Sequence, residues 1–149
     1  MRTVFTVVAV IIAVVFQSFT RPVANGTVTV EVVNLKNSKG VVLVSLFNDS
    51  KSFPKEATKA VGKGKVEIQN GKATISFSNL PFGTYAAAIL HDENSNLKMD
   101  FNMVGMPKEG YGFSNDAKGK LGPPAFDKAA VQLQQEQMKI VINAQYFMR

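Results

Sequence analysis

The chain has 149 residues, a formal net charge of +6 and no cysteine. Without cysteine the fold has no disulfide, and no thiol can carry a lipid at a processed N-terminus. The lysines are scattered rather than clustered. This excludes the basic stripe with interleaved aromatic residues that is typical of a nucleic-acid surface, so we expect no nucleic-acid partner.

The N-terminus has the pattern of a secretory signal. Arg2 precedes an apolar run over residues 4–16. This run is shorter than the roughly 20 residues of a membrane-spanning helix and matches the apolar region of a signal peptide. We place cleavage before Asn25, so that 1–24 is the signal peptide and 25–149 is a single domain. This interpretation predicts an exported protein, periplasmic or extracellular, with no stable membrane insertion after cleavage.

Alternating apolar and polar side chains predict strands along most of the remaining chain. In "TVTVEVVN", Val28, Val30 and Val32 share one face. In "GTYAAAILH", alanines on both faces indicate a strand that is closely packed on both sides. Seven short strands separated by turns predict an all-β fold, a seven-stranded antiparallel β-sandwich of the Ig-like or prealbumin-like type. The predicted strands are Thr27–Asn34, Val41–Phe47, Lys65–Gln69, Lys72–Ser78, Gly83–His91, Lys128–Leu133 and Met138–Phe147.

The strongest local signal is the segment "KVEIQNGKATISF". Its Asn70-Gly71 pair favours the positive backbone angles of a type I′ turn, which joins two antiparallel strands. A two-residue turn there pairs the residues that flank it, and further along it pairs Val66 with Ile75. Because apolar residues then meet apolar residues, we predict a hairpin.

The stretch from residue 92 to residue 126 breaks this pattern. It holds five glycines and three prolines, together with several apolar and aromatic residues. Structureless loops of this length are uncommon in compact domains and are usually functional or disordered. We expect an ordered loop insertion over 92–126 that packs on the sandwich and carries any local function.

The start of this insertion, "HDENSNLKMD", has the spacing of a calcium loop. Asp92, Asn94, Asn96 and Asp100 match positions one, three, five and nine, and the Lys98 carbonyl matches position seven. Asp and Asn also favour tight turns, so a weak to moderate calcium site and a plain polar turn both remain open.

Three residues bear on the choice between these alternatives. Leu97 stands at position six, where the left-handed backbone that glycine adopts freely would cost about 1 kcal/mol. Met103 replaces the bidentate glutamate of position twelve, so that Glu109 or Asp116 would have to complete the coordination shell. His91 would be an unusual calcium ligand, and we expect its ring to donate to a neighbouring carbonyl instead.

The aromatic residues of the insertion have two possible roles. Glycines on either side of Tyr111 let the backbone approach the sheet, and Tyr111 and Phe113 point the same way. They either seal the sandwich as core, which we favour, or line a groove for a small molecule or glycan together with Phe101 and Glu109.

Few enzyme patterns are present. With one histidine, no cysteine and no Gly-x-Ser-x-Gly motif, the usual hydrolase triads are absent from the sequence. A carboxylate mechanism that uses Asp92, Glu93 or Glu109 as acid or base is a third alternative, which we do not favour because nucleophile and oxyanion donors are missing.

Two longer motifs resemble a known family. The approach Phe77-x-Asn79-Leu80-Pro81-x-Gly83-Thr84-Tyr85-Ala86 and the stretch "HDENSNLKMDFNMVGMPKEGYGFSNDAKGKLGPPAF" resemble a secreted bacterial family that is defined only as a domain of unknown function. The resemblance implies an extracytoplasmic β-sandwich without a known activity. The shorter "NLPFGTYA" step is also similar to transthyretin-like and carboxypeptidase-regulatory-like sandwiches.

These observations predict a non-enzymatic, exported β-sandwich, with calcium as the one possible cofactor, that acts in structure or recognition. Its expected partners are a small molecule, a glycan or another protein.

Overall fold

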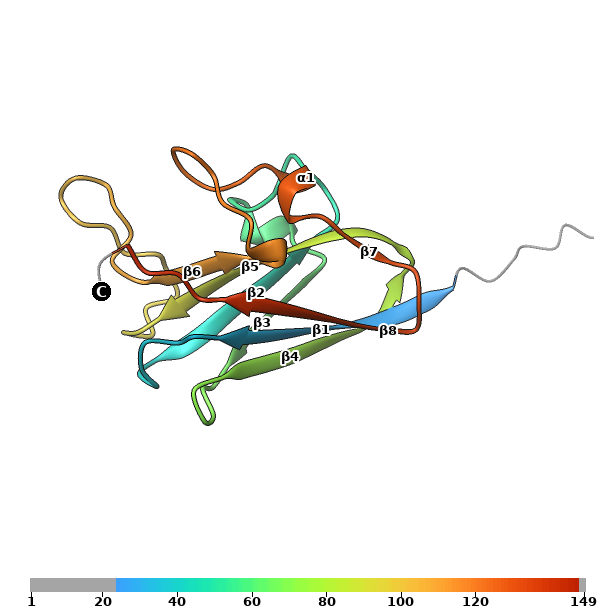
Figure 1. The fold of residues 1–149 in the computed structure, drawn as a ribbon, viewed down its shortest axis with the longest axis horizontal. Helices are drawn as coiled ribbons and strands as arrows, with labels where there is room; N and C mark the ends of the chain where they lie inside the picture. The colour runs from blue at the N-terminus through green and yellow to red at the C-terminus, as the bar shows by residue number, and fades with distance from the viewer. Residues whose placement is uncertain (1–23, 148–149) are drawn as a thin grey trace, which may run out of the picture.

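The structure is a computed structural model that describes residues 24–147, and these form two β-sheets (Figure 1). Nearly all of the predicted signal peptide, residues 1–23, lies outside the described residues. Within residues 24–147, no helix is long and apolar enough to cross a membrane. The strands are β1 (Asn25–Val33), β2 (Val41–Phe47), β3 (Gly62–Val66), β4 (Ala73–Pro81), β5 (Gly83–Asp92), β6 (Gly110–Phe113), β7 (Val131–Leu133) and β8 (Gln137–Asn143). The helices are one α-helical turn, α1 (Phe126–Ala129), and two 3₁₀ turns, η1 (Ala57–Lys59) and η2 (Ser114–Asp116).

The two sheets divide the strands unequally. One sheet has the order β4-β1-β8, and the other has the order β3-β2-β5-β6 with β7 also paired to β5. Neighbouring strands are antiparallel except β1 and β8, which run parallel from Thr27 opposite Gln137 to Val33 opposite Asn143. The predicted all-β sandwich class is therefore confirmed. The prediction of seven strands, all antiparallel, is wrong, because residues 24–147 contain eight strands and one parallel pair.

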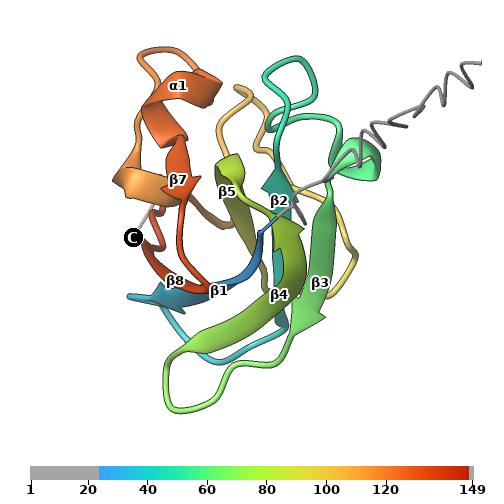
Figure 2. The same cartoon turned by 90° about the vertical axis from the view of Figure 1, so that its right-hand side faces the viewer.

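The main core lies between the two sheets (Figure 2). Alternate residues of β1 and β2 point into it, as the period-two pattern predicts. Six of its side chains, from one strand of each sheet, are each at most 1% exposed: Val28, Val30, Val32, Val42, Val44 and Leu46.

Strand β5 is packed on both faces. Tyr85, Ala87 and Ile89 belong to the main core, whereas Ala86 belongs to a second apolar cluster on the other face. That cluster contains Phe47, Phe53 and Phe113, with the ring centroids of Phe53 and Phe113 5.9 Å apart. The expectation from the alanines is therefore confirmed, and the covering layer comes partly from the 92–126 insertion.

The predicted hairpin is confirmed at its turn but wrong beyond it. Asn70 and Gly71 both have positive φ, and Gln69 and Lys72 exchange two backbone hydrogen bonds of 2.8 and 3.0 Å. The two flanking strands then separate, because β3 pairs with β2 and β4 pairs with β1. The turn thus carries the chain from one sheet to the other, and Val66 lies opposite Val42 rather than Ile75.

Glycines explain this separation. A Cβ on Gly62 would lie 2.6 Å from the ring of Phe77, so the glycine lets β3 pack closely against β4 across the sandwich. Gly64 is in the same position relative to Ile75. A face-to-face contact between β3 and β4 therefore replaces the predicted ladder.

Two elements near the C-terminal half differ from the sequence prediction. Strand β6, "GYGF", was not predicted, because glycine is depleted in strands. It forms because Gly110 and Gly112 leave room for Tyr146 and Ile142. The predicted strand Lys128–Leu133 is shorter, since α1 takes its first residues and only β7 is extended.

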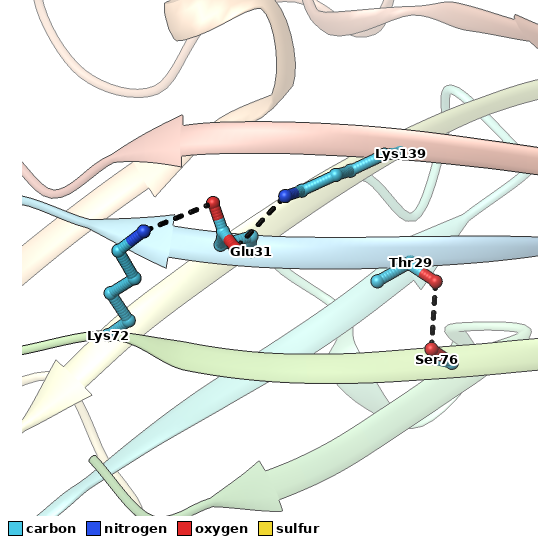
Figure 3. Close-up of polar contacts among 5 residues, drawn as sticks. All are labelled: Thr29, Glu31, Lys72, Ser76 and Lys139. Atoms are coloured by element: carbon cyan, nitrogen blue, oxygen red, sulfur yellow. Dashed lines mark hydrogen bonds and ion pairs between the residues drawn. The ribbon is translucent and has the colours of Figure 1, made fainter. Parts of the chain in front are cut away.

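The outer face of the three-stranded sheet is polar (Figure 3). Glu31 Oε2 accepts a hydrogen bond of 3.0 Å from Lys139 Nζ, and Lys72 Nζ lies 3.8 Å from Oε1 of the same carboxylate. The bond from Lys139 lowers the pKa of Glu31. The Thr29 and Ser76 hydroxyls, 2.8 Å apart, continue this polar face, which alternates with the buried valines of β1.

Tyr85 predicts a loss of stability at alkaline pH. Its hydroxyl donates a 2.7 Å hydrogen bond to the Pro81 carbonyl, and burial raises the pKa of the phenol. Above the ordinary tyrosine pKa of about 10, the unfolded chain ionises first, so stability falls as pH rises through the folded pKa.

We expect Tyr85→Phe to cost about 1 kcal/mol at neutral pH through the lost hydrogen bond. We also expect the variant to lose less stability than wild type between pH 9 and about 11. Urea unfolding at both pH values measures this, and an equal alkaline loss in the two proteins would contradict it.

Candidate functional site

The candidate site is the turn that follows β5, here called the acidic loop (residues 92–100). Its first residue, Asp92, is fully buried. The Asp92 carboxylate accepts hydrogen bonds from the backbone N–H groups of Asn96 at 3.1 Å and Leu97 at 2.8 Å. One side chain at the end of β5 therefore fixes the path of the next five residues.

The predicted ligand side chains converge in this turn. Asp100 accepts hydrogen bonds from the Asn94 amide at 2.7 Å and from the Asn96 amide at 3.1 and 3.2 Å. The amide oxygens of Asn94 and Asn96 accept from the backbone N–H groups of Asn96 and Lys98, respectively. The odd-position spacing thus brings Asp92, Asn94, Asn96 and Asp100 together, as the sequence predicts, with side chains that also hold the turn.

Two residues of the acidic loop have left-handed backbone. Leu97 has φ of 65° and Ser95 has φ of 59°. Such angles cost a non-glycine residue roughly 1–2 kcal/mol. Leu97 therefore adopts the conformation that position six of a calcium loop requires, in spite of its side chain, and the bond from its N–H to Asp92 holds it there.

Glu109 lies directly behind the acidic loop and is 4% exposed. Its two carboxylate oxygens accept from the backbone N–H groups of Glu93 at 3.2 Å and Asp100 at 3.0 Å. Burial raises the pKa of Glu109, and the negative charges of Asp100 and Asp92 raise it further. Of the two acids proposed to complete the shell, Glu109 is therefore at the site.

The other proposed acid, Asp116, is elsewhere. Its carboxylate accepts from the backbone N–H of Asn143 at 3.0 Å and from the Asn143 side-chain amide at 2.6 Å. Asp116 thus ties η2 to β8. In residues 24–147, no group of three or more His, Cys, Asp or Glu side chains has the closeness expected of a bound metal ion. A cation here would take amide and backbone oxygens along with the carboxylates.

The aromatic residues proposed to line a ligand groove do not form one exposed surface. Phe113 is buried in the second apolar cluster, and Tyr111 packs half-buried beside it with ring centroids 6.2 Å apart. Phe101 is 58% exposed and lies on a different loop segment. The core role favoured for Phe113 is confirmed, and Phe113 is not available as an exposed platform for a ligand.

The polar candidates for catalysis are held by neighbouring groups. The Glu93 carboxylate accepts a 2.8 Å hydrogen bond from the side-chain amide of Asn37. Asp92 and Glu109 accept backbone N–H groups, as described above. A surface hollow of about 320 Å³ lies apart from these acids, between Asn34, Asp116, Lys118, Asn143 and Tyr146.

His91 lies next to the acidic loop, together with three residues that sequence analysis did not select: Lys39, Gly40 and Tyr146. His91 is fully buried, and its Nε2 donates to the Lys39 carbonyl at 2.9 Å, as expected for a structural histidine. Because Nε2 carries that hydrogen, Nδ1 accepts from the Tyr146 hydroxyl at 2.6 Å. Gly40 has φ of 66° and lies against the Asp92 backbone. In the sequence, only the position of Gly40 in the turn just before a predicted strand indicated a structural role for this residue.

Comparison with solved structures found a chain described as "Pilus-presented adhesin, Spy0125 (Cpa)". The two are 15% identical, with a TM-score of 0.26, and the match covers 83% of this chain and 27% of the adhesin chain. The present chain therefore spans about a quarter of that protein. Comparison with curated protein sequences gave no match.

The model of one protein family matches residues 30–141, from within β1 to within β8. Its description reads "Uncharacterized protein conserved in bacteria (DUF2141)". The matched range covers more than half of the chain and includes the acidic loop and Glu109. The chain thus belongs to the bacterial family DUF2141.

Proposed function

We propose that the protein is a non-enzymatic, exported β-sandwich whose acidic loop binds calcium, and that the bound ion rigidifies a surface used in recognition. The observation that carries this proposal is the convergence of Asp92, Asn94, Asn96 and Asp100 in front of the buried Glu109. The export part rests on the apolar run 4–16, and the recognition partner would be a glycan, a small molecule or a protein.

Charge supports the calcium part. The raised pKa of Glu109 arises from burial next to two further carboxylates. A divalent cation would relieve their mutual repulsion, and calcium prefers six to eight hard oxygens from carboxylates, amides, backbone and water. The left-handed backbone at Leu97 also matches what a calcium loop requires at that position.

Thermal unfolding with and without calcium tests the proposal. With fewer charges than an EF-hand, we expect a dissociation constant on the order of 10⁻⁴ to 10⁻³ M. At 10 mM, calcium should then raise the free energy of unfolding by about 1.4 to 2.7 kcal/mol relative to chelator. The melting temperature should rise by several degrees, whereas magnesium at the same concentration should have a smaller effect.

Matched variants distinguish calcium binding at the acidic loop from a general effect of salt on the melting temperature. Asp92→Asn together with Asp100→Asn keeps the side-chain shapes and should abolish the calcium response. Asp127→Asn, on the exposed surface of α1, changes charge elsewhere and should leave the response intact. Leu97→Gly should stabilise the calcium-free protein by about 1 kcal/mol because it removes backbone strain, and should retain the response. If the wild-type melting temperature is the same in calcium and chelator, the acidic loop is only a turn.

A further inference from the structure

Two loop tips in the insertion expose apolar side chains. The first is the tip at residues 101–106, where Met103 is fully exposed, Val104 is 78% exposed and Phe101 is 58% exposed. The second is the tip at residues 118–122, where Leu121 is fully exposed. Both loops project from the upper side of the fold in the two views (Figures 1 and 2).

The first tip has a defined backbone that holds these side chains outward. Phe101 and Pro107 form a β-bridge, and the Asn102 N–H donates to the Met106 carbonyl at 2.9 Å. The Asn102 side-chain oxygen accepts from the N–H groups of Val104 and Met106. Four backbone N–H groups of the tip, those of Asn102, Val104, Gly105 and Met106, are thus bonded within it, and its apolar side chains remain in solvent.

Exposed lysines accompany both tips. Lys98 and Lys108 lie on either side of the first tip, and Lys118 and Lys120 precede Leu121. Among the ion pairs within residues 24–147, none involves these four lysines.

Of the three acids in the same region, Glu109 is buried, Asp100 is half-buried and Asp116 is exposed. The carboxylates of Asp100, Glu109 and Asp116 all accept hydrogen bonds from neighbouring amide or backbone N–H groups, and Glu109 is buried. Four exposed lysines thus accompany one exposed and one half-buried acid, so the net exposed charge around the tips is positive.

From this arrangement we infer that the two tips dock the protein on the surface of an anionic lipid bilayer. Apolar side chains in such contacts enter the boundary between headgroups and acyl chains, and lysine stems extend so that their ammonium groups stay at the headgroups. A few apolar side chains give only weak binding, and lysines near an anionic surface add to it. The apolar side chains of the tips suit the boundary with the acyl chains, and the neighbouring lysines suit the anionic headgroups. The inference goes beyond the calcium proposal and does not depend on it.

Tryptophan reporters test the docking directly, because the chain contains no tryptophan. Met103→Trp and Leu121→Trp in the full chain should each show emission at shorter wavelength on addition of phosphatidylglycerol vesicles. Val141→Trp, on the exposed face of β8, is the control and should not shift. The apolar run at residues 4–16 is present in all three variants. A shift at the tips but not at Val141→Trp therefore reports the environment of the tips and not binding through that run.

Lysine variants test the electrostatic part. Lys98→Gln together with Lys108→Gln should lower the vesicle partition coefficient of the Met103→Trp protein by about 25-fold, at about fivefold for each lysine. Lys63→Gln together with Lys65→Gln makes the same charge change on the exposed face of β3 and should lower it by less than about twofold, since charges beyond the Debye length are screened. Raising the salt concentration should weaken binding.

Four results would overturn the inference. These are unchanged emission at both tips, equal shifts with phosphatidylcholine and phosphatidylglycerol vesicles, and a shift at Val141→Trp as large as at the tips. The fourth is a shift without vesicles that grows with protein concentration, since it would mean that a second copy of the chain covers the tips.

Discussion

Replacing Gly40 with alanine is expected to destabilise the protein by about 3 kcal/mol and to weaken its response to calcium. Gly40 has φ of 66°, which costs a residue with a Cβ roughly 1–2 kcal/mol. The added methyl would lie 2.7 Å from the Glu93 carbonyl carbon and closer still to the Asp92 carbonyl oxygen. Relieving such overlap costs typically about 1–3 kcal/mol more. The backbone that must move is the start of the acidic loop, so we expect the loss of stability and the weaker response together.

Gly71→Ala is the matched control. Gly71 also has positive φ, at 74°, but a Cβ there meets nothing within 4 Å. We therefore expect a cost of about 1 kcal/mol, from the backbone alone, and no change in the calcium response. Urea unfolding with calcium and with chelator measures both quantities. Equal costs for the two alanine variants would show that the contact with Asp92 does not matter.

Replacing His91 with alanine is expected to cost about 3–5 kcal/mol. The ring is fully buried, so its removal leaves a cavity at the end of β5. It also leaves the Lys39 carbonyl without its donor and the O–H of Tyr146 without its acceptor, at about 1–3 kcal/mol for each group that stays buried. The measurement is the free energy of unfolding, with circular dichroism to check that the variant folds.

Tyr146→Phe separates the two bonds of the imidazole. It removes the hydroxyl that His91 Nδ1 accepts from, but keeps the aromatic ring against Gly110 and the bond from Nε2 to Lys39. Its other partner, the N–H of Lys36, belongs to an exposed residue and can bond to water instead. We expect a cost of about 1 kcal/mol. If Tyr146→Phe costs as much as His91→Ala, the tyrosine hydroxyl, and not the buried imidazole with its bond to Lys39, accounts for the stability.

The sequence predicted best where one face of an element decides its position. Strands β1 and β8 alternate apolar and polar residues over most of their length, and their burial follows that alternation. In β5, apolar residues on both faces predicted a strand that is packed on both sides. The convergence of Asp92, Asn94, Asn96 and Asp100 also followed from spacing, because a short turn brings alternate residues to one side.

The sequence predicted poorly where the partner lies far along the chain. The Asn70-Gly71 turn was correct, but local turn chemistry does not say which sheet receives β3, which pairs with β2 and lies close to Phe77 of β4 at Gly62. Strand β6 was missed because glycine is depleted in strands, and the residues for which Gly110 and Gly112 leave room, Tyr146 and Ile142, lie far along the chain. Around the site, Lys39 and Tyr146 reach His91 from 52 and 55 residues away, respectively. No local pattern marks such contacts.

The parallel pairing of β1 and β8 has a consequence for the order in which the protein folds. Thr27 lies opposite Gln137, so the first strand of the described chain pairs with the last. Contacts between such distant segments form slowly, because the entropy of closing a long loop is lost before the contacts stabilise the chain. During synthesis, β1 leaves the ribosome long before β8 exists, and only β4 can occupy one of its edges. The three-stranded sheet is completed only after the last strand has been made. On the proposed export route, a chain that leaves before that point would cross the membrane without its finished core.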